Sequence, residues 1–251
     1  MIEFIKVSKR FSEQIALDSI SFKVEKGTAC GYIGPNGAGK TTTAKIIVGL
    51  AKSDSGTVKI LEKNAAVDMK TIQRRVGYVP ESPKLYESLT PAETIAMAAL
   101  LRRLDKKTAN DKLQILSEIF LFKDFLRKPI QSLSKGTKQK VVISLALLFN
   151  PEILILDEPT DGLDVQSVVS LKQVIKSFTG YGGTVFYCSH LLDIVEGVCD
   201  KVYFINKGQI AGEYSKDDFA GKRGYLEDAF IENIGTRNEQ RLINAFFENA
   251  H

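Results

Sequence analysis

The N-terminal third of the chain alternates short apolar-rich runs with polar turns, a pattern that predicts β-strands. These runs are residues 2–7, 21–24, 29–33, 57–60 and 76–79. One stretch of helical spacing, residues 43–50, separates the third run from the fourth. This part of the chain is therefore expected to be mostly strands.

The middle of the chain changes to helical spacing, from Pro91 to Phe149. Thr90 and Pro91 mark the start of that region, because threonine is a good N-cap and proline fits the first position of a helix.

Strand patterns return in the last third, at residues 153–156, 185–188 and 202–205. The first of these is fully apolar, as is typical of a strand inside a parallel sheet. Asn206-Lys207-Gly208 predicts a hairpin turn after the last one.

Strands that alternate with helices predict an α/β fold, in which a parallel sheet carries a mainly helical insertion at about residues 82–150. We assign residues 1–215 to this domain. Residues 216–251 form a polar, helical C-terminal extension, which we expect to dock on the main body or on a partner. Its apolar face consists of Phe219, Leu226, Phe230, Leu242, Phe246 and Phe247.

The composition is that of an ordinary globular chain, with 251 residues of which 44% are hydrophobic and 25% charged. The net charge of +4 allows a basic patch for nucleic acid or membrane lipid, but it favours scattered surface charge. The N-terminus lacks a secretory apolar core, and the apolar run at residues 141–149 is far short of the roughly 20 residues that span a bilayer. We therefore expect no membrane crossing.

Three cysteines, Cys30, Cys188 and Cys199, have no metal-like spacing. Two of them, Cys30 and Cys188, fall in predicted core strands and are interpreted as small buried side chains. With no sign of a disulfide framework, we infer a reducing cytoplasm.

The clearest chemical signal is a phosphate-binding loop between a predicted strand and a predicted helix. It fits the pattern of glycine, any four residues, then Gly-Lys-Ser/Thr. Its glycines let backbone N–H groups point at phosphate oxygens, Lys40 can reach the β- and γ-phosphates, and the Thr41 hydroxyl can ligate Mg²⁺. The alternative is a glycine-rich turn that only caps a helix. The loop consists of Gly34, Pro35, Asn36, Gly37, Ala38, Gly39, Lys40, Thr41 and Thr42.

A second signal is the acidic pair Asp157-Glu158, directly after the apolar strand. A carboxylate at a strand end beside a phosphate loop suits a Mg²⁺ ligand, which we assign to Asp157. Glu158 can take a proton from an attacking water. Alone, the pair would often be a solvated turn, but together with the loop it indicates nucleotide hydrolysis.

A third stretch, Leu133-Ser134-Lys135-Gly136-Thr137-Lys138-Gln139-Lys140, precedes that strand by a short helix. With the loop and the acidic pair, it resembles the signature of the nucleotide-binding subunit of an ABC transporter, and the resemblance covers residues 1 to about 230. Ser134 is a plausible N-cap whose helix end would face an anion. An ordinary capped helix is the alternative for this stretch taken alone.

The resemblance implies a P-loop NTPase core with a parallel sheet, an N-terminal antiparallel β subdomain and a helical subdomain. It also implies that Ser134, Lys135 and Gly136 hold the γ-phosphate of an ATP bound by a second subunit. Two chains would then enclose two nucleotides, as a homodimer or with a second ATPase subunit.

Four further positions match the family. Phe11 stands where an aromatic side chain stacks on adenine, although it could be a core phenylalanine. Glu81 occupies the position usually held by a glutamine that ligates Mg²⁺ or orients water. Asp164 resembles a residue of the loop that contacts the opposite subunit, and His190 resembles the switch histidine at the γ-phosphate.

Two departures from the family pattern bear on these roles. Lys135 and Thr137 replace the usual glycine and glutamine of the signature, and Lys135 adds positive charge near the expected phosphate. Glu81 can still ligate Mg²⁺, but a carboxylate cannot donate a hydrogen bond as an amide does. Both variants, with the tail from Leu226 to Phe230, resemble exporter-type cassettes.

The resemblance implies an ATPase with ATP and Mg²⁺ that drives transport through a separate transmembrane permease subunit. The protein would then lie on the inner face of the cell membrane, held by that subunit through a groove around residues 81–88. One alternative is a soluble ABC ATPase that acts on ribosomes or DNA. Another is a regulator that binds ATP without turnover. The single cassette, the short segment before the signature, and the presence of Glu158 and His190 argue against both, so no nucleic acid is expected.

Overall fold

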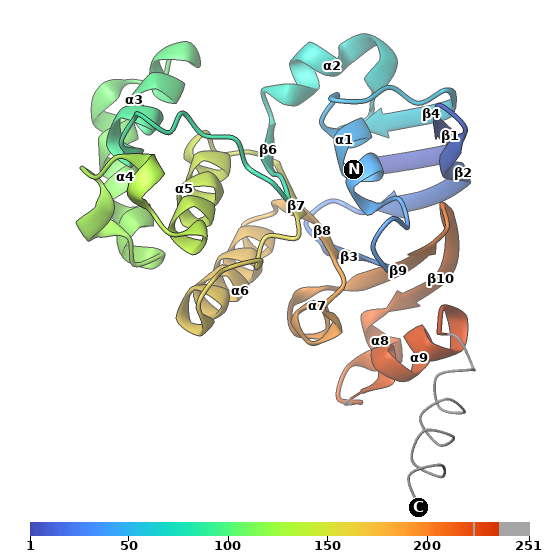
Figure 1. Cartoon of the computed structure of the whole chain (residues 1–251). Coiled ribbons are helices and arrows are strands. Elements are labelled where there is room, and N and C mark those ends of the chain that lie inside the picture. The colour runs from blue at the N-terminus through green and yellow to red at the C-terminus, as the bar shows by residue number, and fades with distance from the viewer. Residues whose placement is uncertain (223, 236–251) are drawn as a thin grey trace, which may run out of the picture.

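A computed structural model describes residues 1–222 and 224–235 of the chain. It is an α/β structure with a small antiparallel sheet, a larger mixed sheet and helices around them (Figure 1). The predicted fold class is therefore confirmed. The division of the chain at residue 215 and the limits of the helical insertion stay predictions.

The small sheet has the order β2-β1-β4-β5 and is built from the N-terminal segments. Its strands are β1 (Ile2–Phe11), β2 (Gln14–Val24), β4 (Ser55–Ile60) and β5 (Lys63–Asn64). The sequence predicted only the apolar halves of β1 and β2. The polar ends of both strands continue as a hairpin, in which Lys9 lies opposite Leu17 and Phe11 lies opposite Gln14. The strands remain paired there, although few of their side chains are buried in this part, because the backbone hydrogen bonds continue.

The larger sheet has the order β10-β9-β3-β8-β7-β6. Its strands are β3 (Ala29–Ile33), β6 (Val76–Val79), β7 (Ile153–Asp157), β8 (Thr184–Ser189), β9 (Lys201–Asn206) and β10 (Gln209–Ser215). All pairings are parallel except that of β9 with β10, which the turn at residues 206–208 joins as the predicted hairpin. The carboxyl ends of β3, β7 and β8 therefore meet at one edge.

Helices cover both faces of the larger sheet and form a separate group on one side of the molecule (Figure 1). They are α1 (Lys40–Ile47), α2 (Ala65–Gln73), α3 (Pro91–Leu101), α4 (Lys106–Ile119), α5 (Lys135–Leu148), α6 (Val165–Gly180), α7 (Leu192–Val198), α8 (Lys216–Phe219) and α9 (Tyr225–Asn233), with short 3-10 turns at Lys123–Phe125 and Ile130–Ser132. The side group consists of α3, α4 and α5, of which α5 also packs on β6 through Ala146 and Gly77.

The predicted helix start at Thr90 is confirmed, since its side chain and that of Glu93 form a reciprocal capping box with Pro91 in the first turn. The continuous helical region is in fact broken twice. Arg103 (φ 56°) and Leu121 (φ 56°) adopt left-handed backbone angles that end α3 and α4.

The helix α2 was not predicted, because only Ala65 and Ile72 of it are buried and the sequence shows no clear apolar stripe there. Its N-terminus is nevertheless well defined, since the Asn64 side chain accepts a hydrogen bond from the N–H of Ala66.

Two hydrophobic cores lie on opposite faces of the larger sheet. One, against the small sheet, contains the contacting rings of Phe4, Phe22, Tyr32 and Phe186. The other lies under α5, α6, α7 and α9. All three cysteines are buried and free, which confirms the interpretation of Cys30 and Cys188.

The C-terminal extension docks on the main body as predicted in its described part. Phe219 and Leu226 are buried, and the ring of Phe230 meets that of Phe204 on β9 edge to face at 5.5 Å. Leu242, Phe246 and Phe247 lie outside the described residues. In the described part of the chain, no helix combines the length and apolar character needed to cross a membrane.

Candidate active site

The loop at residues 34–39 connects β3 to α1, and neighbouring carbonyl oxygens leave no room for a side chain at two of its glycines. Gly39 has a left-handed backbone (φ 115°) at the N-cap of α1, where a side chain would meet the carbonyl oxygen of Ala16. A Cβ atom at Gly34 would clash with the carbonyl oxygen of Ile205. The loop is thus held between two strands, with the start of α1 open to a cavity.

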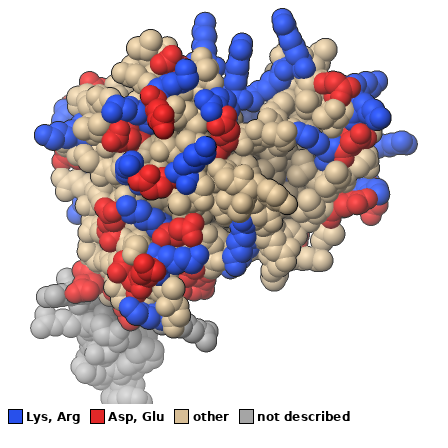
Figure 2. Space-filling view, turned by 180° about the vertical axis from the view of Figure 1, so that it is seen from behind, with Lys and Arg blue, Asp and Glu red and all other residues tan. Residues whose placement is uncertain are grey.

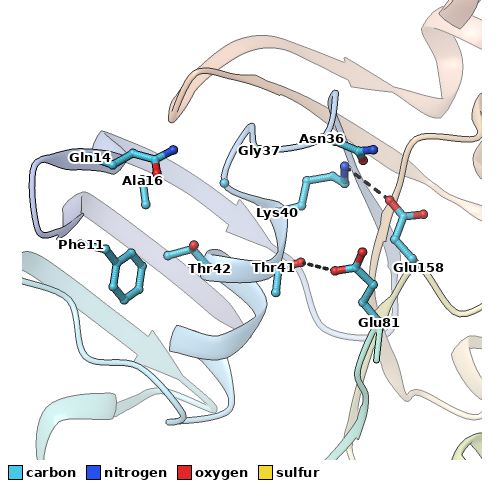
Figure 3. A pocket seen from close by; sticks show the side chains of 11 residues that line it. Phe11, Gln14, Ala16, Asn36, Gly37, Lys40, Thr41, Thr42, Glu81 and Glu158 are labelled. Atoms are coloured by element: carbon cyan, nitrogen blue, oxygen red, sulfur yellow. Dashed lines mark hydrogen bonds and ion pairs between the residues drawn. The ribbon is translucent and has the colours of Figure 1, made fainter. Parts of the chain in front are cut away.

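That cavity has a volume of about 410 Å³ (Figure 3). Phe11 lies at one end and Glu158 at the other, with the loop and the start of α1 between them. Its lining consists of Phe11, Gln14, Ala16, Asn36, Gly37, Gly39, Lys40, Thr41, Thr42, Glu81 and Glu158. The structure therefore brings together the aromatic, the loop and the two acidic side chains that the sequence singled out.

Lys40 is the cation of the cavity and is only 6% exposed. Its Nζ donates to the carbonyl oxygens of Gly34 (2.7 Å) and Pro35 (3.3 Å) and lies 3.4 Å from Oε1 of Glu158. A buried ammonium group needs such partners. A phosphate group in the cavity would meet an ammonium group already oriented by the loop.

Glu158 follows β7 in a strained conformation. Its φ of 47° is unusual for a residue with a side chain, and its N–H donates to the carbonyl oxygen of Cys188. Oε2 accepts a hydrogen bond from Ser189 Oγ (3.2 Å) and lies 3.0 Å from Nδ1 of His190. The carboxylate is thus fixed between Lys40 and His190.

His190 itself lies beside the cavity rather than in its lining, with a side chain that is 55% exposed. It stands directly after β8, which pairs with β7 so that Cys188 is opposite Asp157. This strand pairing explains why two residues far apart in sequence contact each other.

Asp157 is fully buried, and neither of its carboxylate oxygens has a hydrogen-bond partner among the described residues. Burial raises its pKa to about 6, with the nearby carboxylates of Glu81 and Glu158 acting in the same direction. Beside it, Thr41 Oγ1 donates to Glu81 Oε2 (3.3 Å). Unpaired buried oxygens of this kind suit a cation such as Mg²⁺.

No group of three or more acidic, histidine or cysteine side chains within residues 1–222 and 224–235 is arranged to hold a metal by itself.

The signature residues lie outside the lining of this cavity. Ser134 caps α5, as predicted, by accepting from the N–H of Thr137 (3.2 Å). Lys135 forms an ion pair with Asp161 (2.6 Å), and Gly136 packs so closely on the backbone of Gly162 that a side chain would not fit. The signature thus lies against the loop at residues 161–164 of the same chain.

Asp164 in that loop is engaged within its own chain. It caps α6 by accepting from the N–H of Ser167 (2.8 Å), and it pairs with Lys140 at 2.7 Å. The Lys140 ammonium and the Ser167 hydrogen bonds hold the pKa of this carboxyl well below its usual range. Its role toward a second subunit stays a prediction.

Phe11 is 49% exposed, so the alternative of a core phenylalanine is wrong. Its ring lies 5.1 Å from Nζ of Lys9. Gln14 and Ala16, across the hairpin from it, were missed, because the sequence predicted β2 only from residue 21. The sequence feature that could have identified them is the polar segment after Phe11, where the chain turns back toward the phosphate-binding loop.

We expect Phe11→Ala to weaken ATP binding by about 1–3 kcal/mol, the usual contribution of stacking between a base and an aromatic ring. The melting temperature should change little, because the ring is half exposed. Calorimetric titration with ATP and thermal unfolding of the same sample check both parts.

The matched control is Phe22→Ala, which removes a ring that is 5% exposed in the core. This variant should lose about 3–5 kcal/mol of unfolding free energy, as buried phenylalanines do, while its folded fraction binds ATP normally. If Phe11→Ala behaved like Phe22→Ala, the assignment of Phe11 to the adenine would be wrong.

A profile of the ABC transporter family matches residues 17–161. The chain is 35% identical to the bacitracin transport ATP-binding protein BcrA of Bacillus licheniformis over 229 residues, which cover 90% of this chain and 74% of the relative. It is 31% identical to the linearmycin resistance ATP-binding protein LnrL of Bacillus subtilis (strain 168), over 89% of this chain and 72% of the relative.

Solved structures agree with this. An ATP-binding subunit of an ABC transporter superposes with a TM-score of 0.84 at 31% identity, covering 92% of this chain and 98% of that one. A dimeric bacterial ABC transporter cassette at 23% identity (TM-score 0.81, 86% and 99% covered) shares the fold.

The chain belongs to the ABC transporter family. Within it, the chain is an ATP-binding and ATP-hydrolysing subunit. The alternative of an ABC ATPase that acts on ribosomes or DNA is not favoured by any of these matches.

Proposed function

We propose that this chain powers export through a separate membrane subunit by hydrolysing ATP between two cassettes. The observation that carries the proposal is the Glu158 carboxylate, held between Lys40 and His190 at the end of the phosphate-loop cavity. Export is supported by the names of relatives, which include a Nod factor export ATP-binding protein of Burkholderia lata and the linearmycin resistance protein.

Thr41, Asp157 and Glu81 are the residues that would hold Mg²⁺. The unpaired oxygens of Asp157 and the contact between Thr41 and Glu81 support this choice. When bound, the ion would neutralise charge on the β- and γ-phosphates.

The chain's own residues would do the remaining chemistry. Lys40 binds the β- and γ-phosphates, and Phe11 stacks on the base. Glu158 accepts a proton from the attacking water, and its exposed neighbour His190 orients that carboxylate and reaches the γ-phosphate. The hydrogen bond from Ser189 supports the same orientation of Glu158.

A second cassette would complete the site. In one chain, Ser134, Lys135 and Gly136 lie outside the cavity, at the N-terminus of a helix of 14 residues that can face an anion. We assign their anion to the γ-phosphate of the partner's ATP, with Asp164 in the adjacent loop at the same interface. The dimeric cassette among the structural neighbours supports such an arrangement.

The membrane subunit would dock in a groove between the larger sheet and the side group of α3, α4 and α5. This hollow of about 480 Å³ includes Leu50, Tyr78, Lys84 and Phe149 in its lining. Its walls are mostly apolar, contain the cations Lys84 and Arg102, and include part of the segment that follows Glu81. Movement of that segment would couple the nucleotide site to the partner.

A tagged form of the chain, purified from detergent-extracted membranes, should carry a membrane protein with several spanning segments. Leu50→Asp should abolish this association, because the side chain is 67% exposed and lines the groove. Ile115→Asp, at a site on α4 that is 58% exposed and outside the groove lining, is the matched control. Recovery with ribosomes at moderate salt and never with a membrane protein would contradict the proposal.

A further inference from the structure

We propose that the turn between α3 and α4 binds an anionic lipid surface. The inference rests on the proposed docking groove for its orientation, but its chemistry comes from the turn itself. Leu100 and Leu101, in the last turn of α3, are 79% and 76% exposed. Four cationic side chains follow them, namely Arg102, Arg103, Lys106 and Lys107, and all four are exposed.

Arg103, Lys106 and Lys107 are available to a ligand, whereas Arg102 is engaged with the ring of Phe149 and the carbonyl oxygen of Gln73. None of the four forms an ion pair with any residue in the described part of the chain, whereas many other lysines do. The one carboxylate among them, Asp105, caps α4 by accepting from the N–H groups of Lys107 and Thr108. The scattered charge expected from the net value of +4 therefore includes one local excess of positive charge.

The exposed leucines give the turn an apolar component. Leu100 also lines a hollow of about 590 Å³ between α3 and α4, whose walls include Ala96, Ala99 and Ala109. Lys106 lies at the same hollow. Aliphatic side chains beside unpaired lysines and arginines are the pattern of segments that lie in the headgroup region of an anionic bilayer.

The position of the turn between α3 and α4 also fits a lipid surface as its partner. Arg102 lines the proposed docking groove, covers the ring of Phe149 at 4.8 Å and donates to the carbonyl oxygen of Gln73 at the end of α2. In Figure 1, α2 and α3 lie along the same upper edge. Figure 2, which keeps that edge at the top, shows Lys and Arg side chains projecting from it. A membrane subunit in the groove would place this edge toward the bilayer.

Nucleic acid is a weaker candidate for the same surface. The phosphate backbone of a nucleic acid attracts lysine and arginine as well as an anionic lipid surface does. It does not explain why two leucines are exposed at the end of α3. A lipid surface accounts for the charges and the leucines together.

The test is flotation of the full-length chain, without nucleotide, on vesicles of phosphatidylcholine alone or mixed with phosphatidylglycerol. Binding should require phosphatidylglycerol and weaken as salt is raised. Replacing Lys106 and Lys107 together by glutamine should reduce partitioning by about fivefold for each lysine, or about 25-fold in total. Leu100→Ser with Leu101→Ser should weaken binding at every salt concentration.

The matched control replaces Lys26 and Lys176 by glutamine, which removes the same charge from exposed sites elsewhere. Its binding should equal that of the unaltered chain. The proposal would be overturned if the two lysine double variants lost binding equally, or if the chain bound both vesicle types equally. It would also be overturned if a duplex oligonucleotide of equal phosphate concentration displaced the chain from the vesicles. Because these vesicles contain no membrane subunit, the result is independent of whether the chain docks on such a partner. ATP binding by every variant confirms that it is folded.

Discussion

Lys40→Ala should remove nearly all turnover and most affinity for ATP. The lost charge-assisted hydrogen bonds to phosphate contribute about 1.5–3 kcal/mol or more, which is at least a tenfold loss in affinity. Since Lys40 also neutralises charge that develops on the transferring phosphate, the catalytic loss should be larger than the binding loss. Calorimetry with ATP and an assay of phosphate release measure the two effects separately.

Lys45→Ala is the control for this variant. Lys45 lies on the same helix, but its side chain is exposed and lines no part of the cavity. It should bind and hydrolyse ATP like the unaltered chain. Normal phosphate release by Lys40→Ala would mean that the loop between β3 and α1 does not hold the nucleotide.

Glu158→Gln should bind ATP normally but hydrolyse it about 10²–10⁴-fold more slowly, the usual loss when a general base is removed. Glutamine keeps the shape of glutamate but cannot accept the proton of water. It also removes the carboxylate that lies 3.4 Å from Lys40 in the structure, so the lysine is freer to meet phosphate. ATP should therefore stay bound in this variant.

Unhydrolysed ATP should hold two copies of this variant together. If Ser134 and Gly136 of one chain contact the γ-phosphate bound by the other, light scattering should give the mass of a dimer with Mg-ATP and of a monomer with ADP. Full ATPase activity in the variant would exclude Glu158 as the base. A monomer at saturating ATP, even with the membrane subunit present, would exclude the shared site.

The phosphate loop could be predicted because all its members are consecutive, and a single strand–loop–helix unit fixes their geometry. For Glu158 and His190, the sequence predicted only that each residue follows an apolar strand. It did not predict that the two side chains are in contact. The 3.0 Å approach depends on β7 lying beside β8 in the sheet, which the order of strands along the chain does not state. The pairing of Lys40 with Glu158 depends on the strained turn after β7 and could not be predicted.

The missed parts are those where the backbone, rather than side-chain burial, determines the structure. Gln14 and Ala16 reach the cavity because β1 and β2 continue as a hairpin beyond their apolar positions. The helix α2 is held at its start by Asn64 and buries too few side chains to leave a pattern. The break after α3 depends on the left-handed conformation of Arg103, which arginine does not usually adopt.

The most direct test of the account is the rate of phosphate release from Mg-ATP as a function of protein concentration. If a second chain completes the site, the rate per molecule should rise with protein concentration and level off once the chains are paired. Lys40→Ala should show almost no release at any concentration. A rate per molecule that is the same at all concentrations would contradict a site shared by two chains. So would a rate of release no higher than that of Lys40→Ala at concentrations where the dimer is complete.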